Sequence, residues 1–306
     1  MSKHKNPLYF YIITTILLFF NGIMILFPKE ILWGVKRGLL LWYNNVLPTL
    51  FPFMVVNSML IRLGFPQSLG RVAEPIFKRL FNIRGEGAFP VVIGIISGCP
   101  LGAKTVCELY TQGLLNKDEA ERLSFICNNT GMAFVIGAVG ERMLKDTYIG
   151  AKLLAVQYLS AAVIGVVCGL LSDKKVYGST INSAKPCNNL FSAFSESVIS
   201  GVSTITYVGG FIVLFSVICI IIGFLPLGNA RGMIYGILEL TNGMEALTKG
   251  EKISYPVLCS LIAWGGFSIH AQSLSFIVNS GLSSKKYLMG KLLHSLTAFL
   301  TALFIF

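Results

Sequence analysis

Charged residues are scarce in this chain of 306 residues: Asp, Glu, Lys and Arg make up 13% of it, against roughly 25% in soluble domains. So few charges cannot cover the surface of a water-soluble protein of this size. Hydrophobic residues make up 54% of the sequence, and the apolar runs at 6–27 and 255–278 reach the length of about 20 residues that a membrane-spanning helix needs. The composition therefore predicts an integral membrane protein.

Catalytic and metal-binding signatures are missing as well. The sequence has no HExxH motif, no GxSxG motif and no pair of aspartates within an apolar segment. The seven cysteines form no CxxC pair and mostly lie in apolar runs, so we expect neither a disulfide framework nor a zinc site. We expect no enzyme, no cofactor and no metal.

Acidic residues are outnumbered, with 14 Asp and Glu against 25 Lys and Arg, a net charge of +11. The basic residues lie in short segments between apolar runs, which indicates the positive-inside bias of membrane-protein loops and not nucleic-acid binding. The first apolar run follows a basic flank, is too long for a typical signal peptide and precedes no small-residue cleavage site. We expect a retained first span with the N-terminus in the cytoplasm.

The apolar segments predict an all-α polytopic protein with a single membrane domain. Complete spans are expected over 8–27, 39–61, 148–171 and 288–306, with a short basic loop after the first that carries Lys29, Lys36 and Arg37. The basic stretch 62–87 is expected on the cytoplasmic side, with an amphipathic segment at 75–83 on the membrane surface. Residues 190–226 are expected to form a surface helix followed by a span.

Other apolar segments are interrupted and too short to cross a bilayer of about 30 Å at 1.5 Å per residue. The pieces 89–97 and 101–115 predict a re-entrant hairpin, and the pieces 119–127 and 132–140, on either side of "CNNTG", predict a broken span. In the second half, "RGMIYGILELTNGMEALTKG" has the same short-break-short form, and the span 255–278 is interrupted at "AWGGFSIHAQ".

The order of these features is the same in the two halves, which predicts two inverted-topology repeats. Each repeat has an intact span, a re-entrant helical hairpin and a broken transmembrane helix. The expected division is 1–37 for the first helix and loop, 38–147 for repeat 1, 148–189 for a connecting helix and polar loop, and 190–306 for repeat 2. Such repeats are typical of transporters, whose substrate site lies at the midplane between the breaks.

The stretch "GCPLGAKT" superficially resembles a phosphate-binding loop. Counted from Gly98, however, Ala103 stands where the motif G-x-x-x-x-G-K-[ST] requires glycine, and a soluble α/β setting is missing. Gly94, Gly98 and Gly102 recur every four residues, which lets neighbouring helices approach closely. The stretch therefore indicates a helix break inside a membrane.

The residues after this break suit an anion site. Pro100 lacks an N–H and suits the first position of a half-helix over 100–115, whose N-terminus would attract an anion. Lys104 lies one turn further along the half-helix, and a lysine at bilayer depth usually has a function or a partner. It either binds an anion, pairs with Glu108 at i+4, or extends to the membrane surface.

Polar residues also mark the other breaks. Asn128, Asn129 and Thr130 either bind a substrate or satisfy the backbone groups freed at the break. Glu239 either takes part in proton or cation coupling or pairs with a basic residue. The expected tip of the second hairpin consists of Thr241, Asn242 and Gly243.

In the third motif, Gly265 and Gly266 predict a backbone break. Ser268, His270 and Gln272 follow at intervals of two, which suits an unwound helix better than one helical face. His270 is either a proton carrier or a hydrogen-bonded structural group.

The motifs "SGCPLGAK", "GILELTNG" and "WGGFSIHAQ", in this order, resemble those of sporulation integral membrane proteins of the YlbJ/SpoVV type, which carry nucleoside-recognition gate domains. The resemblance covers roughly residues 38–290. It implies a multi-pass membrane protein of endospore-formers, related in fold to concentrative nucleoside transporters. The implied function is movement of dipicolinic acid across the outer forespore membrane.

The resemblance implies a substrate site at matching residues, namely Ser97, Gly98, Pro100, Gly102, Lys104, Glu239, Thr241, Gly243, Gly265, Gly266, His270 and Gln272. From the residues themselves we add Cys99, Asn128, Asn129, Thr130, Asn242, Trp264 and Ser268. Family members usually have tyrosine where Cys99 stands and are often longer, which leaves open a paralogue with another substrate. Dipicolinate is a planar dianion, which two half-helix N-termini, Lys104 and a protonated His270 could hold while Trp264 stacks on its ring.

The leading interpretation is thus a transporter of a small organic anion, in the cell membrane or the outer forespore membrane, with a proton or Na⁺ as its coupling ion. A nucleoside or related solute is the alternative substrate, its ribose hydroxyls bound by Glu239 and the asparagine pair. An alternative of another class is a non-transporting sporulation scaffold or sensor. The expected partners are the small-molecule substrate and the lipid bilayer, without nucleic acid, and a homo-oligomer is compatible with the sequence.

Overall fold

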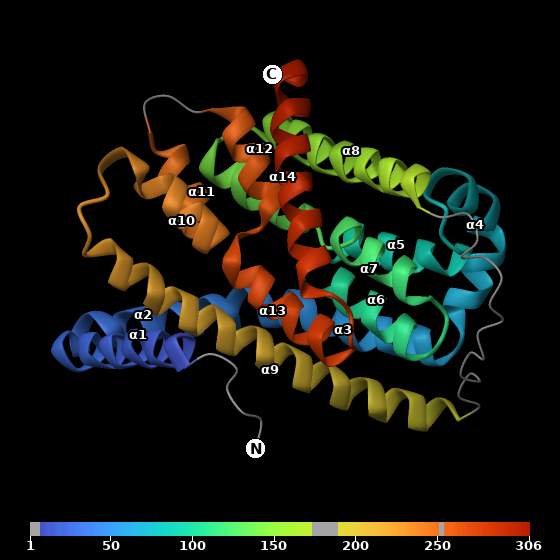
Figure 1. Cartoon of the computed structure of the whole chain (residues 1–306), viewed down its shortest axis with the longest axis horizontal. Coiled ribbons are helices and arrows are strands. Elements are labelled where there is room, and N and C mark those ends of the chain that lie inside the picture. Colours follow the sequence, from blue (N-terminus) through green and yellow to red (C-terminus); the bar gives the residue numbers. More distant parts are fainter. Residues whose placement is uncertain (1–6, 173–188, 251–253) are drawn as a thin grey trace.

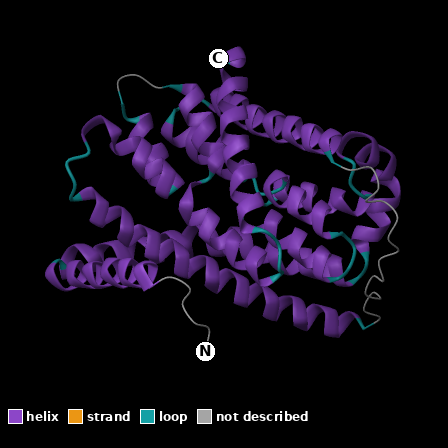
Figure 2. Cartoon of the chain, in the orientation of Figure 1, coloured by secondary structure: helices purple, strands orange, loops and turns teal. Residues whose placement is uncertain are grey.

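The computed structural model describes residues 7–172, 189–250 and 254–306, and this part of the chain is helical without any strand (Figures 1 and 2). Within it, five helical segments are long and apolar enough to cross a membrane: Pro28–Arg62, Thr147–Leu171, Leu190–Gly223, Tyr255–Asn279 and Ser284–Ile305. The expected all-α polytopic membrane protein is confirmed.

The described residues 7–172 contain eight α-helices and three helical segments of other geometry. The α-helices are α1 (Pro7–Leu26), α2 (Pro28–Leu41), α3 (Leu47–Arg62), α4 (Phe65–Phe81), α5 (Ala88–Ile96), α6 (Leu101–Thr111), α7 (Lys117–Ile126) and α8 (Thr147–Leu171). The other segments are the π-helices η1 (Trp42–Val46) and η3 (Ala133–Met143) and the 3-10 helix η2 (Gly85–Gly87).

The described residues from 189 onward, without 251–253, form fewer elements that are on average longer. They are α9 (Leu190–Gly223), the 3-10 helix η5 (Gly228–Ala230), α10 (Arg231–Leu238), α11 (Leu240–Thr248), α12 (Tyr255–Trp264), α13 (Gly266–Asn279) and α14 (Ser284–Ile305). The helix α9 packs along α2 and α3, while α14 passes through the middle of the molecule between α12, α8 and α7 (Figure 1).

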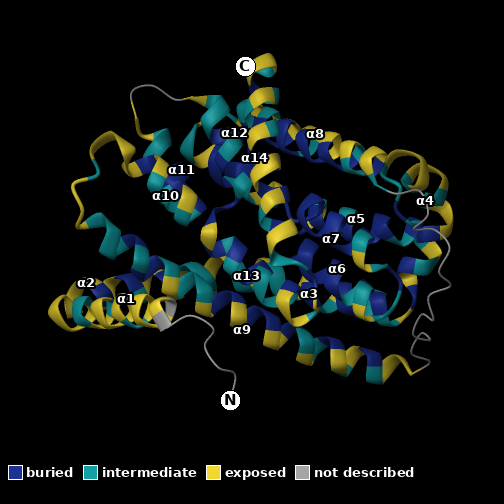
Figure 3. Ribbon diagram, viewed as in Figure 1, coloured by how far each residue is buried: buried dark blue, intermediate teal, exposed yellow. Residues whose placement is uncertain are grey.

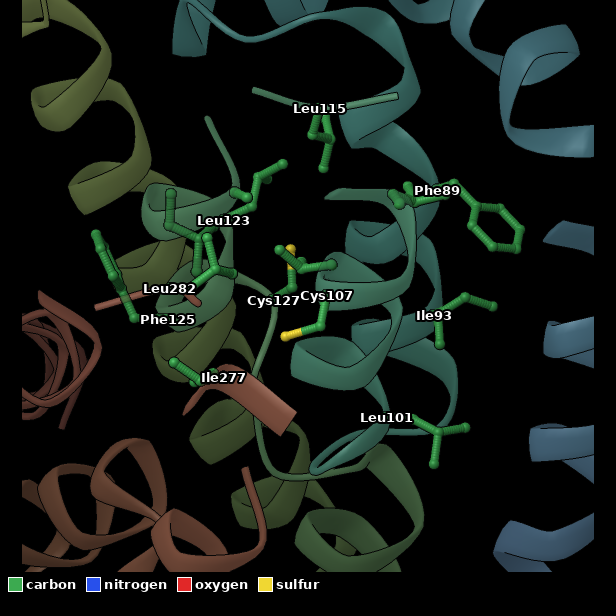
Figure 4. Packing of buried hydrophobic residues seen from close by; sticks show 14 of the residues in the cluster. Phe89, Ile93, Leu101, Cys107, Leu115, Leu123, Phe125, Cys127, Ile277 and Leu282 are labelled. Atoms are coloured by element: carbon green, nitrogen blue, oxygen red, sulfur yellow. The ribbon is translucent and has the colours of Figure 1, made fainter. Parts of the chain in front are cut away.

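Buried residues concentrate in the central helices, whereas the outer faces of α1, α4, α8 and α9 expose many large apolar side chains (Figure 3). One apolar cluster joins α5, α6 and α7 to α13 and includes Leu101, Leu123 and Ile277 (Figure 4). A second cluster joins η3, α8, α12 and α14. Exposed apolar faces around a packed core are what a lipid environment requires of a multi-pass protein.

The basic loop expected after the first span is wrong, because Lys29, Lys36 and Arg37 lie on α2. Helix α2 starts with Pro28 at its first position and continues through η1 into α3. Two glycines let it approach α9: a Cβ atom at Gly34 would lie 2.7 Å from Ile220 Cδ1, and one at Gly38 would lie 2.8 Å from Val213 Cα. Close packing against α9 therefore keeps this basic segment helical.

The first apolar run forms α1, of which residues 10–26 make a shorter apolar helix than the five segments above. Its role as a complete span stays a prediction. The expected amphipathic segment at 75–83 falls mostly within α4, and its position relative to the membrane stays a prediction too. Of the expected polar loop, residues 173–188 lie outside the described part.

The surface helix and separate span expected over 190–226 are instead one helix, α9, of 34 residues. Asn189 caps its start, accepting through Oδ1 from the backbone N–H groups of Phe191 (3.0 Å) and Ser192 (3.2 Å). Gly209 does not break the helix but makes room for the ring of Trp42, whose Nε1 donates to the Ile205 carbonyl at 3.0 Å.

Candidate functional site

The first interrupted segment is a pair of short helices, α5 and α6, joined by residues 97–100, which we call the first tip. Gly98 has a φ of +77°, and a Cβ atom there would lie 2.5 Å from the backbone nitrogen of Gly131. The backbone N–H of Cys99 donates to the Asn129 carbonyl at 2.7 Å. The first tip therefore lies directly on residues 127–131, the interruption between α7 and η3, which we call the first break.

Helices α5 and α6 both contact the first break through glycine. A Cβ atom on Gly94 or on Gly102 would lie 2.1 Å from the carbonyl oxygen of Cys127, so no larger residue fits at either position. The glycine spacing thus produces the expected close approach. Two details differ from expectation: Pro100 precedes the first residue of α6, and α6 ends at Thr111 rather than at residue 115.

The three polar residues of the first break are buried and mainly satisfy other parts of the protein. Asn128 donates through Nδ2 to Ser273 Oγ (2.9 Å) and to the Tyr287 hydroxyl (2.7 Å). Asn129 Nδ2 donates to the Ile126 carbonyl at 2.8 Å, and Thr130 Oγ1 donates to the Ile262 carbonyl at 2.8 Å. The first break is therefore held to α12, α13 and α14.

Lys104 is buried on α6, and its ammonium group is hydrogen-bonded to the carboxylate of Glu108 one turn later. Its Nζ also lies 3.4 Å from Ser200 Oγ on α9. Of the roles considered for Lys104, the structure shows the i+4 pair. Binding of a substrate anion by Lys104 stays a prediction. Ser97, at the start of the first tip, is also buried.

The second interrupted segment turns at Glu239 between α10 and α11. Glu239 and the first turn of α11, with Thr241 and Asn242, form what we call the second tip. The Glu239 carboxylate accepts from the backbone N–H groups of Thr241 (3.0 Å) and Asn242 (2.8 Å) and from Asn242 Nδ2 (2.8 Å). In this structure the N-terminus of α11 is therefore occupied by a carboxylate of the chain itself. Gly243 brings α11 against α10, since its Cβ would lie 2.1 Å from Gly236 Cα.

The span 255–279 is interrupted at Gly265 and Gly266, the second break, where both residues have positive φ angles of +89° and +85°. The second break faces the second tip: a Cβ atom on Gly266 would lie 3.1 Å from the Leu240 nitrogen. Trp264 joins the same contact, because its Nε1 donates to the Ile237 carbonyl at 3.2 Å. A hairpin tip thus meets a helix break in each half of the chain.

The unwinding expected around Ser268, His270 and Gln272 is confined to the two glycines, so the expected irregular backbone at these three residues is wrong. All three lie within the continuous helix α13 and are buried. Residues at intervals of two point to different sides of a helix, and the sides that carry these three residues are covered here because α13 packs against α6, α9, α10 and α14.

The first break and the third motif meet at one hydroxyl group. The Tyr287 hydroxyl of α14 receives the hydrogen bond from Asn128 and lies 3.0 Å from His270 Nδ1. The ring of Trp264 stands edge-on to that of His270, with centroids 4.2 Å apart. Tyr287 was not anticipated, because nothing in an apolar span indicates which tyrosine will face the interior.

A cavity of about 250 Å³ opens beside the second tip. It is lined by Arg37, Leu40, Leu41, Asn44, Asn45, Ser216, Glu239, Thr241 and Asn242. The structure thus brings three of the expected substrate-binding residues to one cavity, together with polar residues of α2, η1 and α9 that sequence reasoning missed. Asn44 and Asn45, two polar residues inside an otherwise apolar span, were the available signal for this cavity wall.

The cavity combines both charge signs with neutral polar groups. Arg37 reaches Glu245 of α11 with a distance of 3.4 Å between Nη2 and Oε2, and both side chains are more than two-fifths exposed. An exposed pair of this kind is weak, so the guanidinium group remains able to bind a carboxylate. Among the described residues, no group of three or more His, Cys, Asp or Glu side chains could hold a metal ion.

Comparison with known proteins bears on this arrangement. The chain is 25% identical, over an alignment of 330 residues, to the sporulation integral membrane protein YlbJ of Bacillus subtilis. The chain is similar to YlbJ over almost its whole length. The alignment covers 94% of this chain and 80% of YlbJ, which confirms the expected resemblance to YlbJ-type proteins. With its five candidate spans, the chain is a multi-pass integral membrane protein.

A second relative matches over a smaller part of the chain. An uncharacterized protein of Methanocaldococcus jannaschii is 28% identical over 154 residues, which is 49% of this chain and 49% of that protein. No protein-family model matches the chain, and no solved structure matches it. The gate-domain family and the kinship with concentrative nucleoside transporters therefore stay predictions.

Proposed function

We propose that the chain is a membrane transporter of a small organic anion that acts in sporulation. The observation that carries this proposal is the meeting of a hairpin tip with a helix break in both halves of the chain. Non-helical backbone at membrane depth is tolerated where it is buried in protein or lines a cavity, and paired interrupted helices are typical of transporters. The similarity to YlbJ, a sporulation integral membrane protein, supports the cellular context.

The order of elements supports two repeats. A long span, Pro28–Arg62 or Leu190–Gly223, precedes each interrupted hairpin, which is α5 with α6 or α10 with α11. An interrupted span and a further long helix, α8 or α14, then complete each half. Rocking of one repeat against the other would expose the cavity alternately to the two sides of the membrane.

Dipicolinate is the substrate that we propose, moving across the outer forespore membrane, as the YlbJ/SpoVV-type resemblance implies. Arg37 offers a planar guanidinium group that can bind a carboxylate through two parallel hydrogen bonds. Ligand cavities usually measure about 300–1,000 Å³, so the cavity of about 250 Å³ beside the second tip suits a small solute. The lining asparagines supply neutral donors for a second carboxylate.

A nucleoside is the second candidate, favoured by Glu239 in the cavity wall. A carboxylate repels an anion but accepts hydrogen bonds from hydroxyl groups such as those of ribose. Asn44, Asn45 and Asn242 would add amide groups around the same solute.

Uptake of labelled dipicolinate and labelled uridine into proteoliposomes tests the proposal. We expect dipicolinate to be transported, and its uptake at low concentration to be strongly reduced in Arg37→Gln proteoliposomes. Uptake should be unchanged in Arg71→Gln, a matched change of an exposed arginine on α4 that does not line the cavity. Transport of uridine alone would exclude the organic-anion assignment. The scaffold alternative predicts that Lys104→Ala and Glu239→Gln leave sporulation intact, whereas the transporter predicts loss of flux at normal protein abundance.

A further inference from the structure

A lysine that no motif marks lies in the centre of the molecule. Lys291 belongs to α14, one of the five candidate spans, and only 1% of its surface is exposed. A charged side chain at bilayer depth is expensive and usually has a specific function. Yet within the described residues Lys291 forms no ion pair, whereas Lys286 on the same helix pairs with Glu121 at 2.6 Å.

The partners of Lys291 are uncharged. Its Nζ donates to the Asn128 carbonyl at 2.9 Å and lies 3.3 Å from His294 Nδ1. On the other side of the ring, His294 Nε2 lies 3.0 Å from the Gln157 carbonyl. A carbonyl only accepts, so Nε2 carries the hydrogen and Nδ1 of the neutral ring accepts from Lys291.

This geometry accommodates a lysine with or without its third proton. A neutral amine has two N–H groups, enough for both hydrogen bonds, and an ammonium has three. The side-chain oxygens of Asn128 and Gln157 are buried and accept no hydrogen bond within the described residues, so the cluster has acceptors left for an additional donor. In the part of the chain that the structure describes, no carboxylate pairs with Lys291 and fixes its charge.

Lys291 is connected to the first break through its first partner. The Asn128 carbonyl is one of the backbone groups freed at the first break, on which the first tip lies. A cation bound to freed carbonyls at a helix break is what couples many transporters to an ion gradient. Here the cation is covalently part of the chain.

The remaining titratable groups around the cluster are thiols, phenols and an imidazole, none of which is negatively charged at neutral pH at its ordinary pKa. Tyr287 is on the same helix and Cys99, His270 and Tyr158 come from the first tip, α13 and α8, while α12 contributes the thiol of Cys259 to the neighbouring core. The acidic residues of α7 that reach α14, Asp118 and Glu121, bind Lys286 near its N-terminus instead.

We propose that Lys291, with His294 as its hydrogen-bond partner, is the site at which transport is coupled to a proton. This proposal rests on the proposed transport function. When the site opens to one side, an N–H bond of the ammonium breaks, the electron pair stays on Nζ and the proton passes to water. Protonation from water on the other side restores the ammonium, whose hydrogen bond to the Asn128 carbonyl is stronger than that of the neutral amine.

Proteoliposomes that contain a pH-sensitive dye test the coupling. With wild-type protein we expect solute movement to be accompanied by proton movement and an imposed pH gradient to drive accumulation. Lys291→Met, and Lys291→Arg with its permanent charge, should lose both. Lys286→Met, a change of a 58% exposed lysine on the same helix, should keep both. Proton movement by either Lys291 variant at the wild-type ratio to solute would overturn the proposal.

A second measurement does not depend on transport. The unfolding temperature of the detergent-solubilised protein is measured from acid to alkaline pH. In the wild type and in Lys286→Met, we expect a change of this temperature over the pH range in which Lys291 loses its proton. Lys291→Met and Lys291→Arg should lack this change. Identical pH curves for wild type and both Lys291 variants would overturn the proton site even if solute is transported. If no solute flux is found but the unfolding temperature still shows the Lys291-dependent change with pH, the proposed function is rejected and the proton site is retained.

Discussion

At the first tip, backbone lies on backbone, whereas at the second tip a side chain fills the contact and a cavity remains beside it. Gly98 touches Gly131 and Gly102 touches Cys127, and the polar groups nearby are bound to buried partners. Glu239 instead caps α11 with its own carboxylate and lines the cavity. Two interruptions of similar sequence form are thus built for different tasks.

The difference assigns a role to each half. The first tip and first break form a closed polar centre that contains Asn128 and Lys291, without space for a solute between their backbones. The second tip leaves room and offers both charged and neutral groups. We therefore propose that the solute binds at the second tip and that the ion is coupled at the first break, which would make the two interruptions separable by mutation.

The largest expected difference in stability between the two interruptions comes from substitution of their glycines. Gly98→Ala should destabilise the protein by about 3 kcal/mol, because a clash with backbone, about 1–3 kcal/mol, adds to left-handed strain of about 1–2 kcal/mol. Gly265→Ala meets no atom closer than 3.7 Å and should show only the strain. The measurement is the temperature at which half of the detergent-solubilised protein leaves its size-exclusion peak.

Gly210→Ala is the control for this pair, since a Cβ atom there has no neighbour within 4 Å. It should leave the unfolding temperature at or above the wild-type value, because alanine is the better helix former. If Gly98→Ala and Gly265→Ala behave alike, the first tip is not closed by backbone contact as described.

Substitution of Asn128 at the first break and of Asn242 at the second tip should give a smaller difference in stability. Asn128→Ala removes the donor to Ser273 and Tyr287 and leaves buried hydroxyl groups without it, which should cost about 2 kcal/mol. Asn242→Ala, at the partly buried second tip, removes one side-chain hydrogen bond and should cost about 0.5–1 kcal/mol. The same thermal assay compares the two variants. A larger loss of stability for Asn242→Ala than for Asn128→Ala would show that the first break is not the more buried of the two polar regions.

The sequence predicted where the helices are interrupted better than what surrounds the interruptions. Residues such as Gly98, Pro100 and Gly265 break helices through local backbone preference, which one sequence reveals. The span expected over 148–171 accordingly matches α8, Thr147–Leu171. Basic residues misled the prediction at α2, because packing of Gly34 and Gly38 on α9 outweighs the loop signal of Lys36 and Arg37.

Contacts between residues that are distant in the sequence could not be predicted from the sequence. Arg37 and Glu239 are far apart in the sequence, yet both line the cavity. Lys291 sits in a segment that hydropathy shows only as a span, and its bond to the Asn128 carbonyl depends on how α14 packs against the first break. Such juxtapositions arise from tertiary packing, which no local pattern encodes.

The helix cap at the second tip should have an intermediate effect. Glu239→Ala removes the three hydrogen bonds that its carboxylate accepts and should cost about 1 kcal/mol, the usual value of an N-cap. Glu239→Gln keeps one acceptor oxygen and should cost less. Ser97→Ala at the first tip is the counterpart, and because the Ser97 hydroxyl has no hydrogen-bond partner among the described residues, its unfolding temperature should stay near wild type. Equal losses for Glu239→Ala and Ser97→Ala would show that the carboxylate does not cap α11.

The smallest effect on stability and the sharpest on binding should come from Arg37. Its exposed pair with Glu245 contributes about 0–1 kcal/mol, so Arg37→Gln should barely change the unfolding temperature. Hydrogen bonds to charged groups contribute about 1.5–3 kcal/mol, and 1.4 kcal/mol is tenfold in affinity. The dipicolinate concentration at half-maximal uptake should therefore rise about tenfold or more. Lys104→Gln on α6, next to the first tip, loses its pair with Glu108 and should leave that concentration unchanged. The opposite pattern would move the solute to the first tip, because only a residue that touches the anion changes its affinity without unfolding the protein.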